Sequence, residues 1–392
     1  MNKALLHLEV QEFLRKNLKT TPAELALRGS PFPGISSSEL AQQLTGLQKA
    51  EKKLPTWFSH SQIYYPPKLN LEQTSSETTA KYKASILKGE TLIDLTGGLG
   101  IDDFYFAENF KEVIHCELNT ELFEIAAHNL KQLGRENIYF KNEDSITFLK
   151  DSDRNFDCIY VDPARRDNAG GKVFKLVDCL PNIPKNLDLL LSKSNKILIK
   201  TSPLLDLQAG ISELKFVAKI YIVAINNEVK ELLWLLKKNE ISITKIKTLN
   251  FTKKGIEEFE GIFNKTAYEI NYSLPKNFIY EPNAAIMKSG LFDEVAHQTQ
   301  TSKLHPNSHL YTSEKEIFFP GRKFKVIDIQ EYKYGILKKK FKGLKANITI
   351  RNFPESVEIL RKKLKIKDGG KNYLFFTTNT KNEKIVLFCE KC

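Results

Sequence analysis

The chain has 392 residues, which suggests two or three domains of roughly 150 residues each. Hydrophobic residues make up 41% of the chain and charged residues 27%, so a disordered or low-complexity protein is excluded. Apolar runs such as Leu232–Leu236 fall far short of the ~20 residues that a membrane span needs, and no secretory signal opens the chain. Five cysteines are too few and too scattered for a disulfide framework, so we expect a cytoplasmic protein with reduced thiols.

The formal net charge of +12 is concentrated at one end of the chain. Residues 331–392 contain 16 Lys and Arg against 6 Asp and Glu, whereas the rest of the chain is nearly neutral. A compact basic module on a neutral body is typical of a nucleic-acid-binding appendage. A lysine-rich solvated surface remains the alternative interpretation of charge alone.

Residues 1–70 are predicted to form a helical cap. Helices are expected over Lys3–Asn17, from Thr21, and after the serines at 36–38, where hydroxyls can cap the first amides. The aromatic, proline-broken stretch that follows indicates a connector, and we expect Trp57, Phe58, Tyr64 and Tyr65 to pack this cap rather than to stack on RNA.

Residues 71–250 alternate helices with short apolar strands, beginning with a capping-box spacing at Thr74-x-x-Glu77 that predicts a helix to about Lys88. Repeated β-α units of this kind favour an α/β fold with a doubly wound, mostly parallel sheet. A closing antiparallel hairpin is expected around Asn226-Asn227. The predicted strands are Thr91–Leu95, Val113–Glu117, Asn137–Lys141, Cys158–Val161, Lys196–Lys200, Lys219–Ile225 and Glu231–Leu236.

Residues 251–320 show little regular patterning apart from a helix that runs through His297, whereas residues 321–392 follow a regular β-α-β-α-β-β pattern. The expected elements of this last segment are the strand Phe324–Ile329, the helix Tyr332–Phe341, the strand Ala346–Ile350, the helix Glu355–Leu364, and a hairpin of Tyr373–Thr378 with Lys384–Cys389.

A glycine-rich loop, Asp94-Leu95-Thr96-Gly97-Gly98-Leu99-Gly100, follows the first strand of the predicted sheet. Glycines let a ligand approach the backbone at the edge where open α/β sheets bind ligands. Asp103 stands where a dinucleotide fingerprint would have its third glycine, and an acidic residue there would repel a pyrophosphate. Hydride-transfer chemistry is therefore disfavoured.

Acidic residues close consecutive strands of the sheet: Asp94, Glu117, Asp144 and Asp162. Four carboxylates on one edge suit a ligand that carries a cation with hydroxyl and amine donors, and S-adenosylmethionine has these groups. Glu117 lies 23 residues after Asp94, at the usual place for a carboxylate that accepts ribose hydroxyls. Ordinary strand-end polar residues are the alternative for each position taken singly.

The sequence resembles the class I S-adenosylmethionine-dependent methyltransferases, and in particular bacterial members with a ferredoxin-like domain and a C-terminal THUMP-like domain. The resemblance rests on LPTWF (54–58), LEQTSSETTAKYKA (71–84), LIDLTGGLGID (92–102), YVDPARRD (160–167), IKTSP (199–203), YEPNAAIMKSG (280–290), KLHPNSHLYTS (303–313) and KANITIRNFPESV (345–357).

The resemblance implies a Rossmann-like methyltransferase domain at 71–250, a ferredoxin-like α+β domain at 251–320 and an RNA-binding THUMP-like domain at 321–392. The residues that it implies for the cofactor are Asp94, Thr96, Gly97, Gly98 and Gly100 at the methionine and adenosine, Glu117 at the ribose, Asp144 at the adenine amine, and Asp162.

Asp162-Pro163-Ala164-Arg165 occupies the place where amino-group methyltransferases carry Asp/Asn-Pro-Pro-aromatic. In that motif the carboxylate or amide and the proline carbonyl accept hydrogen bonds from an exocyclic amine of an unpaired base. We therefore expect Asp162, Pro163 and Arg165 at the reaction centre. Because Ala164 and Arg165 replace the second proline and the aromatic residue, Arg165 or Arg166 is expected to stack on a base or bind phosphate instead.

These features predict an S-adenosylmethionine-dependent methyltransferase acting on a base nitrogen of structured rRNA or tRNA, with no membrane partner. The residues expected to bind RNA are Arg166, Lys338, Lys339, Lys340, Lys342, Arg351, Arg361, Lys362 and Lys363. An RNA-binding or assembly protein with a degenerate methyltransferase domain, or a DNA or protein methyltransferase, remains an alternative. Cys158 is expected to be inert, and the lone Cys389-x-x-Cys392 with scattered histidines predicts no metal site.

Overall fold

The computed structural model describes residues 1–165, 175–238, 243–265 and 268–392. The chain divides into two compact units, and the division passes through one β-hairpin. Unit 1 contains residues 1–218 and 233–241, and unit 2 contains residues 219–232 and 242–392. No helix in the described ranges is long and apolar enough to cross a membrane.

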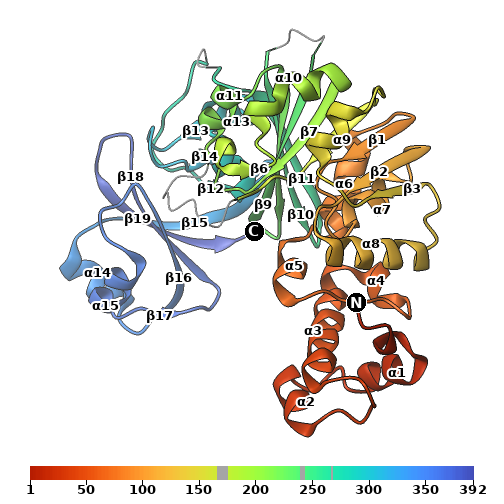
Figure 1. Cartoon of the computed structure of the whole chain (residues 1–392). Helices are drawn as coiled ribbons and strands as arrows, with labels where there is room; N and C mark the ends of the chain where they lie inside the picture. The colour runs from red at the N-terminus through yellow and green to blue at the C-terminus, as the bar shows by residue number, and fades with distance from the viewer. Residues whose placement is uncertain (166–174, 239–242, 266–267) are drawn as a thin grey trace. The chain divides into compact units, whose positions relative to one another are not determined.

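The first seventy residues of unit 1 are helical, as predicted (Figure 1). Thr21 and Ser36 each begin a helix in a capping box. The hydroxyl accepts a hydrogen bond from the amide three residues later, and the glutamate at that later position accepts one from the backbone amide of the capping residue. The predicted first helix is interrupted at His7, which caps its second part. The helices are η1 (Lys3–Leu6), α1 (Leu8–Lys16), α2 (Pro22–Arg28), α3 (Ser37–Lys53), α4 (Pro55–Ser59) and α5 (Lys68–Gln73).

The connector docks this cap onto the α/β part of unit 1. Trp57, Tyr64 and Tyr65 are buried, and Trp57 lies edge-on to Phe104 with ring centroids 4.9 Å apart. The Asn129 side chain exchanges two 2.9 Å hydrogen bonds with the backbone of Tyr64. The expectation that these aromatic residues pack the cap is confirmed.

The capping prediction at Thr74 is wrong. Thr74 ends α5, and the helix α6 (Glu77–Ile86) begins instead at Ser76, whose hydroxyl accepts from the Thr79 amide. The Glu77 carboxylate is turned toward Thr56, where it accepts a hydrogen bond from the hydroxyl. Tertiary packing onto the helical cap therefore overrides the local capping-box signal.

A nine-stranded sheet has the order β11-β10-β8-β9-β7-β4-β1-β2-β3. The core strands lie where the sequence predicts them, in parallel register. They are β1 (Thr91–Asp94), β2 (Glu112–Cys116), β3 (Ile138–Lys141), β4 (Cys158–Val161) and β7 (Lys196–Thr201). The short strands β5 (Ala164–Arg165) and β6 (Cys179–Leu180) form a separate pair.

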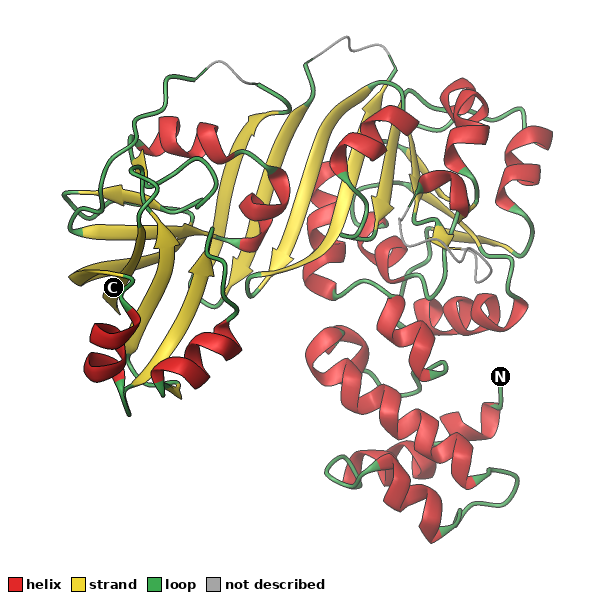
Figure 2. Cartoon of the chain, turned by 90° about the vertical axis from the view of Figure 1, so that its left-hand side faces the viewer, coloured by secondary structure: helices red, strands yellow, loops and turns green. Residues whose placement is uncertain are grey.

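The order of the parallel strands reverses between β1 and β4, which lie side by side. Because crossovers are right-handed, the reversal places α7 (Ile101–Phe106) and α8 (Thr120–Gln132) on one face, and α9 (Ser145–Asp151) and α10 (Ile183–Lys193) on the other. Helices α6 and α7 pack together, as do α9 and α10, and Figure 2 shows helices against the sheet. The remaining unit 1 helices are η2 (Leu176–Asp178) and α11 (Leu207–Glu213).

The predicted closing hairpin is present as β8 (Val217–Ile225) and β9 (Glu228–Lys237). Its turn residues Asn226 and Asn227 both have positive φ, of 49° and 66°, as a two-residue hairpin turn requires. The hairpin makes β9 antiparallel to the strands beside it. Beyond β8 the sheet continues with β10 (Lys245–Thr252), parallel to β8, and β11 (Gly255–Ile262), antiparallel to β10.

Unit 2 also contains an eight-stranded sheet in the order β13-β14-β12-β15-β19-β18-β16-β17. The β-α-β-α-β-β pattern predicted for the end of the chain is confirmed, with one extra two-residue strand. The elements are β12 (Phe278–Pro282), α12 (Ala284–Ser289), α13 (Phe292–Thr299), β13 (Ser302–Lys303), β14 (Tyr311–Ser313), β15 (Gly321–Glu331), α14 (Tyr334–Phe341), β16 (Lys345–Arg351), α15 (Val357–Leu364), β17 (Lys367–Asp368), β18 (Asn372–Thr378) and β19 (Lys384–Lys391).

Candidate methyl-transfer site

The glycine-rich loop joins β1 to α7 at the carboxyl edge of the parallel sheet. The Gly97 amide donates to the Cys116 carbonyl at 2.8 Å, which ties the loop to the end of β2. A Cβ on Gly97 would lie 2.2 Å from the His115 ring, so only glycine fits over this histidine. Gly98 and Gly100 have positive φ, of 56° and 70°, and a Cβ on Gly98 would meet only the Thr96 carbonyl oxygen, at 3.7 Å.

A buried carboxyl-imidazole cluster supports the loop from below. Asp94 is 2% exposed, and Asp103 and His115 are fully buried. His115 Nδ1 lies 2.6 Å from Asp103 Oδ2, and Asp94 Oδ1 accepts hydrogen bonds from the amide and hydroxyl of Thr96. Burial raises the pKa of both carboxyls well above the usual range, and the charge of a neighbouring aspartate adds to the shift. Burial likewise lowers the pKa of His115.

Asp103, the acidic residue that would repel a pyrophosphate, is buried beneath the loop. Its side chain turns inward to His115 because the first turn of α7 packs against β2. Asp94 also lies beneath the loop, where it fixes Thr96 and does not present an open carboxylate. His115 is a packed histidine.

Glu117 follows β2 directly and adjoins the glycine loop. Its Oε2 accepts from the Gly98 amide at 2.9 Å, and its Oε1 accepts from the Asn119 amide at 2.7 Å. A carboxylate oxygen has two lone pairs, so each oxygen keeps capacity for a further donor. The structure thus brings the predicted ribose carboxylate into direct contact with the loop.

Asp144 follows β3 and is exposed. It caps α9, with Oδ1 accepting from the amide and hydroxyl of Thr147, both at 2.8 Å. The second oxygen makes no hydrogen bond with any residue in the described part of the chain. Asp144 is therefore fixed in orientation while one acceptor faces outward.

Asp162 follows β4, and its backbone amide donates to the Thr96 hydroxyl at 2.7 Å. This bond links the Asp-Pro-Ala-Arg segment directly to the glycine loop. The Asp162 carboxylate forms an ion pair with the Lys200 ammonium through Oδ2, and the two side chains are 36% and 11% exposed. Asp162 Oδ1 makes no hydrogen bond within the described ranges.

The remaining residues of the segment are only partly described. Pro163 is buried and Ala164 is exposed. Arg165 lies in β5, paired with Cys179. Arg166, expected to contact RNA, lies outside the described residues.

Sequence reasoning missed the positively charged residues behind the site. Lys200 is the one lysine that breaks the apolar run of β7, and this interruption at the carboxyl end of a buried strand is the signal that could have identified it.

Lys83 is fully buried, 3.0 Å from Asp102, whose other oxygen accepts from the Tyr160 hydroxyl at 2.8 Å. Burial opposes ionisation of Asp102, but the Lys83 and Lys200 charges outweigh it and lower the pKa of this carboxyl.

Cys158 is buried, and burial raises the pKa of its thiol to about 11, so it is not a reactive nucleophile. Cys389 is also buried, with a pKa raised by burial to about 12. All five cysteines are free.

The basic residues expected to bind RNA fall into two groups. Lys338, Lys339 and Lys342 lie on or beside α14, and Lys362 lies on α15, with no ion pair among the described residues. The second group pairs with acids: Lys340 with Asp328, Arg351 with Glu281, Arg361 with Asp368 and Lys363 with Glu355. Helices α14 and α15 pack together over a core that includes Leu337 and Leu360.

The parallel order β3-β2-β1-β4-β7, followed by the antiparallel β9 and then β8, is the topology of a class I S-adenosylmethionine-dependent methyltransferase domain. Comparison with known proteins finds a match over the whole chain. The structure is similar to the crystal structure of a Porphyromonas gingivalis W83 protein, provisionally named a methyltransferase, with a TM-score of 0.86 and 32% identity. The similarity covers 100% of this chain and 99% of that one.

The ferredoxin-like domain family matches residues 278–320, and the THUMP domain-like family matches residues 321–391. A Mycobacterium tuberculosis relative, named an uncharacterized S-adenosylmethionine-dependent methyltransferase, is 24% identical over 41% of this chain and 42% of its own length. An uncharacterized RNA methyltransferase of Mycoplasma mobile is 35% identical over 20% of this chain and 21% of its own. The matches thus span less than half of these curated relatives.

The chain therefore belongs to the family of S-adenosylmethionine-dependent methyltransferases that carry a ferredoxin-like and a THUMP-like domain. The site suits the cofactor of this family. Gly98 has no side chain, and a Cβ there would meet only the Thr96 carbonyl oxygen, so a ligand can approach the loop backbone at this point. Glu117, Asp144 and Asp162 offer acceptors for hydroxyl, amine and cationic groups.

Proposed function

We propose that the protein transfers the methyl group of S-adenosylmethionine to a nitrogen of an RNA base, in structured rRNA or tRNA. The observation that carries the proposal is the hydrogen bond from the Asp162 amide to Thr96. It holds the carboxylate of the Asp-Pro-Ala-Arg segment beside the loop that receives the cofactor. Positioning of the reacting nitrogen against the methyl group supplies most of the rate enhancement in such a transfer.

Each residue of the cofactor edge has a separate role in this proposal. The methionine and adenosine parts of the cofactor lie against the loop residues Thr96, Gly97, Gly98 and Gly100. Glu117 accepts the ribose hydroxyls while its bonds to the Gly98 and Asn119 amides keep it in place. Asp144 accepts from the adenine amine with its outward oxygen. The bound cofactor supplies an electrophilic methyl group on a sulfonium.

The substrate amine is held by acceptors of the Asp-Pro-Ala-Arg segment. Asp162 Oδ1 and the Pro163 carbonyl accept hydrogen bonds from the amine, which turns the nitrogen lone pair toward the methyl group. Lys200 positions Asp162 through its ion pair on Oδ2. Arg165 takes the place of the aromatic residue, with a guanidinium that stacks on the base or binds phosphate.

RNA as the substrate class is supported by two independent features. The THUMP domain-like match covers the segment that carries the net positive charge of the chain, and one relative is named an RNA methyltransferase. Lys338, Lys339, Lys342 and Lys362 are available for phosphate contacts. The basic residues that form ion pairs, such as Arg351 and Arg361, can bind a phosphate only by giving up their acidic partner.

The proposal is tested by transfer of labelled methyl groups to RNA, DNA and protein fractions from cells that lack the gene. Asp162→Ala is expected to reduce transfer to RNA at least 100-fold while S-adenosylmethionine binding persists, because the reacting nitrogen loses its acceptor. Asp162→Asn retains a carbonyl oxygen and is expected to be less impaired. Asp188→Ala, at an exposed aspartate of α10, is the matched control. Label in DNA or protein alone, or none with cofactor bound, contradicts the proposal.

A further inference from the structure

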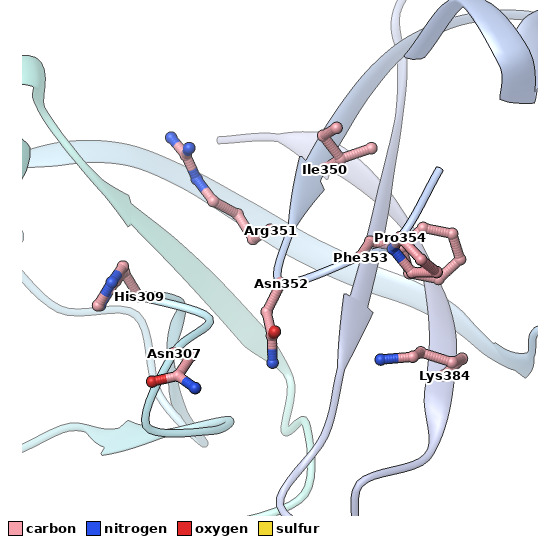
Figure 3. Close-up of a pocket in the computed structure, with 8 residues that line it drawn as sticks. All are labelled: Asn307, His309, Ile350, Arg351, Asn352, Phe353, Pro354 and Lys384. Atoms are coloured by element: carbon pink, nitrogen blue, oxygen red, sulfur yellow. The ribbon is translucent and has the colours of Figure 1, made fainter. Parts of the chain in front are cut away.

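Unit 2 contains a pocket of about 510 Å³ that lies apart from the glycine loop in the sequence. Two segments and one further residue line it: Asn307 with His309, residues 350–354, which include the last two residues of β16, and Lys384 at the start of β19. Figure 3 shows Asn307 and His309 on one side, and Asn352, Phe353 and Lys384 on the other. The first two segments belong to sequence blocks that the methyl-transfer site leaves unused.

The pocket is positively charged. Arg351 and Lys384 line it, and the lining contains no carboxylate. Glu281, which is 3% exposed, accepts from Arg351 at 2.7 Å but also pairs with Arg322 through its other oxygen. One carboxylate thus serves two guanidinium groups and leaves one positive charge in excess. Arg351 Nε is buried and makes no hydrogen bond within the described part of the chain.

The donors are held in place by a network of hydrogen bonds. The Lys384 ammonium donates to Thr378 Oγ1 at 2.6 Å, and that hydroxyl donates to the Asn352 carbonyl, also at 2.6 Å. His305 Nδ1 accepts from the Asn352 side chain at 3.0 Å and from the Asn307 amide at 3.1 Å. Asn352 adopts a left-handed conformation, with φ of 50°, which turns the chain at the pocket wall.

Apolar surface lies beside these donors. Phe353 packs edge-on against Tyr332 and Phe376, with ring centroids 4.9 Å and 5.6 Å away, and is only partly buried. The His309 ring is stacked on Phe292 with ring centroids 3.6 Å apart. Burial and the charges of Lys303 and Arg351 lower the pKa of His309 to about 4, so this wall is neutral at physiological pH.

We infer that this pocket binds one unpaired nucleotide of the RNA substrate. The phosphate lies against Arg351 and Lys384, and the base lies on the apolar surface of Phe353. The volume falls in the ~300–1,000 Å³ range of small-ligand sites, which suits a single nucleotide. A concave pocket selects unpaired nucleotides, because bases in a duplex are stacked and cannot enter. The inference rests on the proposed function for its choice of RNA.

The test measures binding of a fluorescein-labelled, mixed-sequence single-stranded RNA heptamer to the full-length protein by anisotropy. Lys384→Gln is expected to weaken binding about fivefold and to reduce the slope of log K against log salt concentration by about 0.7, the value for one contact to a single strand. Arg351→Gln is expected to weaken it about tenfold. Lys381→Gln, an exposed lysine outside the pocket, should leave binding unchanged.

Three results would overturn the inference. They are no binding of the heptamer, equal binding by the wild type and Lys384→Gln, or competition by adenosine monophosphate as strong as by the heptamer, which would indicate a free-nucleotide site. Methyl transfer to RNA is measured on the same preparations. If wild-type transfer persists while Lys384→Gln leaves heptamer binding unchanged, the pocket assignment fails and the proposed function stands. If wild-type transfer to RNA is absent, the proposed function fails.

Discussion

Gly97→Ala tests why a glycine stands at position 97 of the loop. The structure indicates that the His115 ring leaves no room for a side chain there, rather than that the loop needs a flexible backbone. The added Cβ would lie 2.2 Å from His115 Cε1 and 2.3 Å from Nδ1. The ring cannot withdraw easily, because it is fully buried and bonded to Asp103. Overpacking of this kind typically costs about 1–3 kcal/mol. If the loop moves to relieve the clash, the Gly98 amide leaves Glu117, and S-adenosylmethionine affinity falls about 5- to 150-fold.

The assay is calorimetric titration with S-adenosylmethionine together with thermal denaturation. Gly335→Ala is the control, since this glycine, like Gly97, has no positive φ and no atom lies within 4 Å of the new Cβ. In a His115→Ala background the added methyl should do less damage, because the ring that it meets is gone. If Gly97→Ala binds the cofactor within twofold of wild type at an unchanged melting temperature, this account of the loop is refuted.

Three further predictions concern charge. Lys83→Met should lower the free energy of unfolding by about 3 kcal/mol, because the buried Asp102 carboxylate loses its closest cation; an unchanged urea midpoint would contradict this. Reversing Lys338 and Lys339 to Glu should weaken RNA binding and reduce its salt dependence while leaving cofactor affinity alone, and a filter-binding titration with unaltered RNA affinity would refute it. The pKa of His309 is about 4 in the folded protein and about 6.5 in the unfolded chain. The unfolded chain therefore binds a proton that the folded protein does not, and the free energy of unfolding falls as the pH decreases from 6.5 to 4. In the His309→Asn variant the urea midpoint should decrease less over this pH range than in the wild type. The prediction would be wrong if the urea midpoints of the two proteins decreased in parallel.

Most of the fold could be predicted because its signals are local. Short apolar runs of two to four residues mark β1, β4 and β7, and the Asn226-Asn227 turn marks the hairpin. The Thr74 capping box failed because Glu77 has a tertiary partner in Thr56, and a pattern within four residues carries no information about a contact 21 residues away. The short strand β17 pairs over only two residues and has no sequence signature.

The site was predictable where strand ends coincide with acidic residues, as at Glu117, Asp144 and Asp162. It was not predictable where function depends on which way a side chain turns. Asp103 is the third residue of α7, close to the loop in sequence, yet its side chain turns inward to His115. The pairing of Lys200 with Asp162 joins two strands 38 residues apart, and only the adjacency of β4 and β7 brings them together.

The most direct test is nucleoside analysis by mass spectrometry of RNA from cells that lack the gene, after incubation with the protein and isotopically labelled S-adenosylmethionine. The account predicts one labelled nucleoside, with the methyl group on a base nitrogen, in a single rRNA or tRNA species. That nucleoside should be absent with Asp162→Ala and present with Asp188→Ala. Label on a ribose hydroxyl, on a base carbon, or on protein would contradict the role of Asp162 as the acceptor that holds an amine.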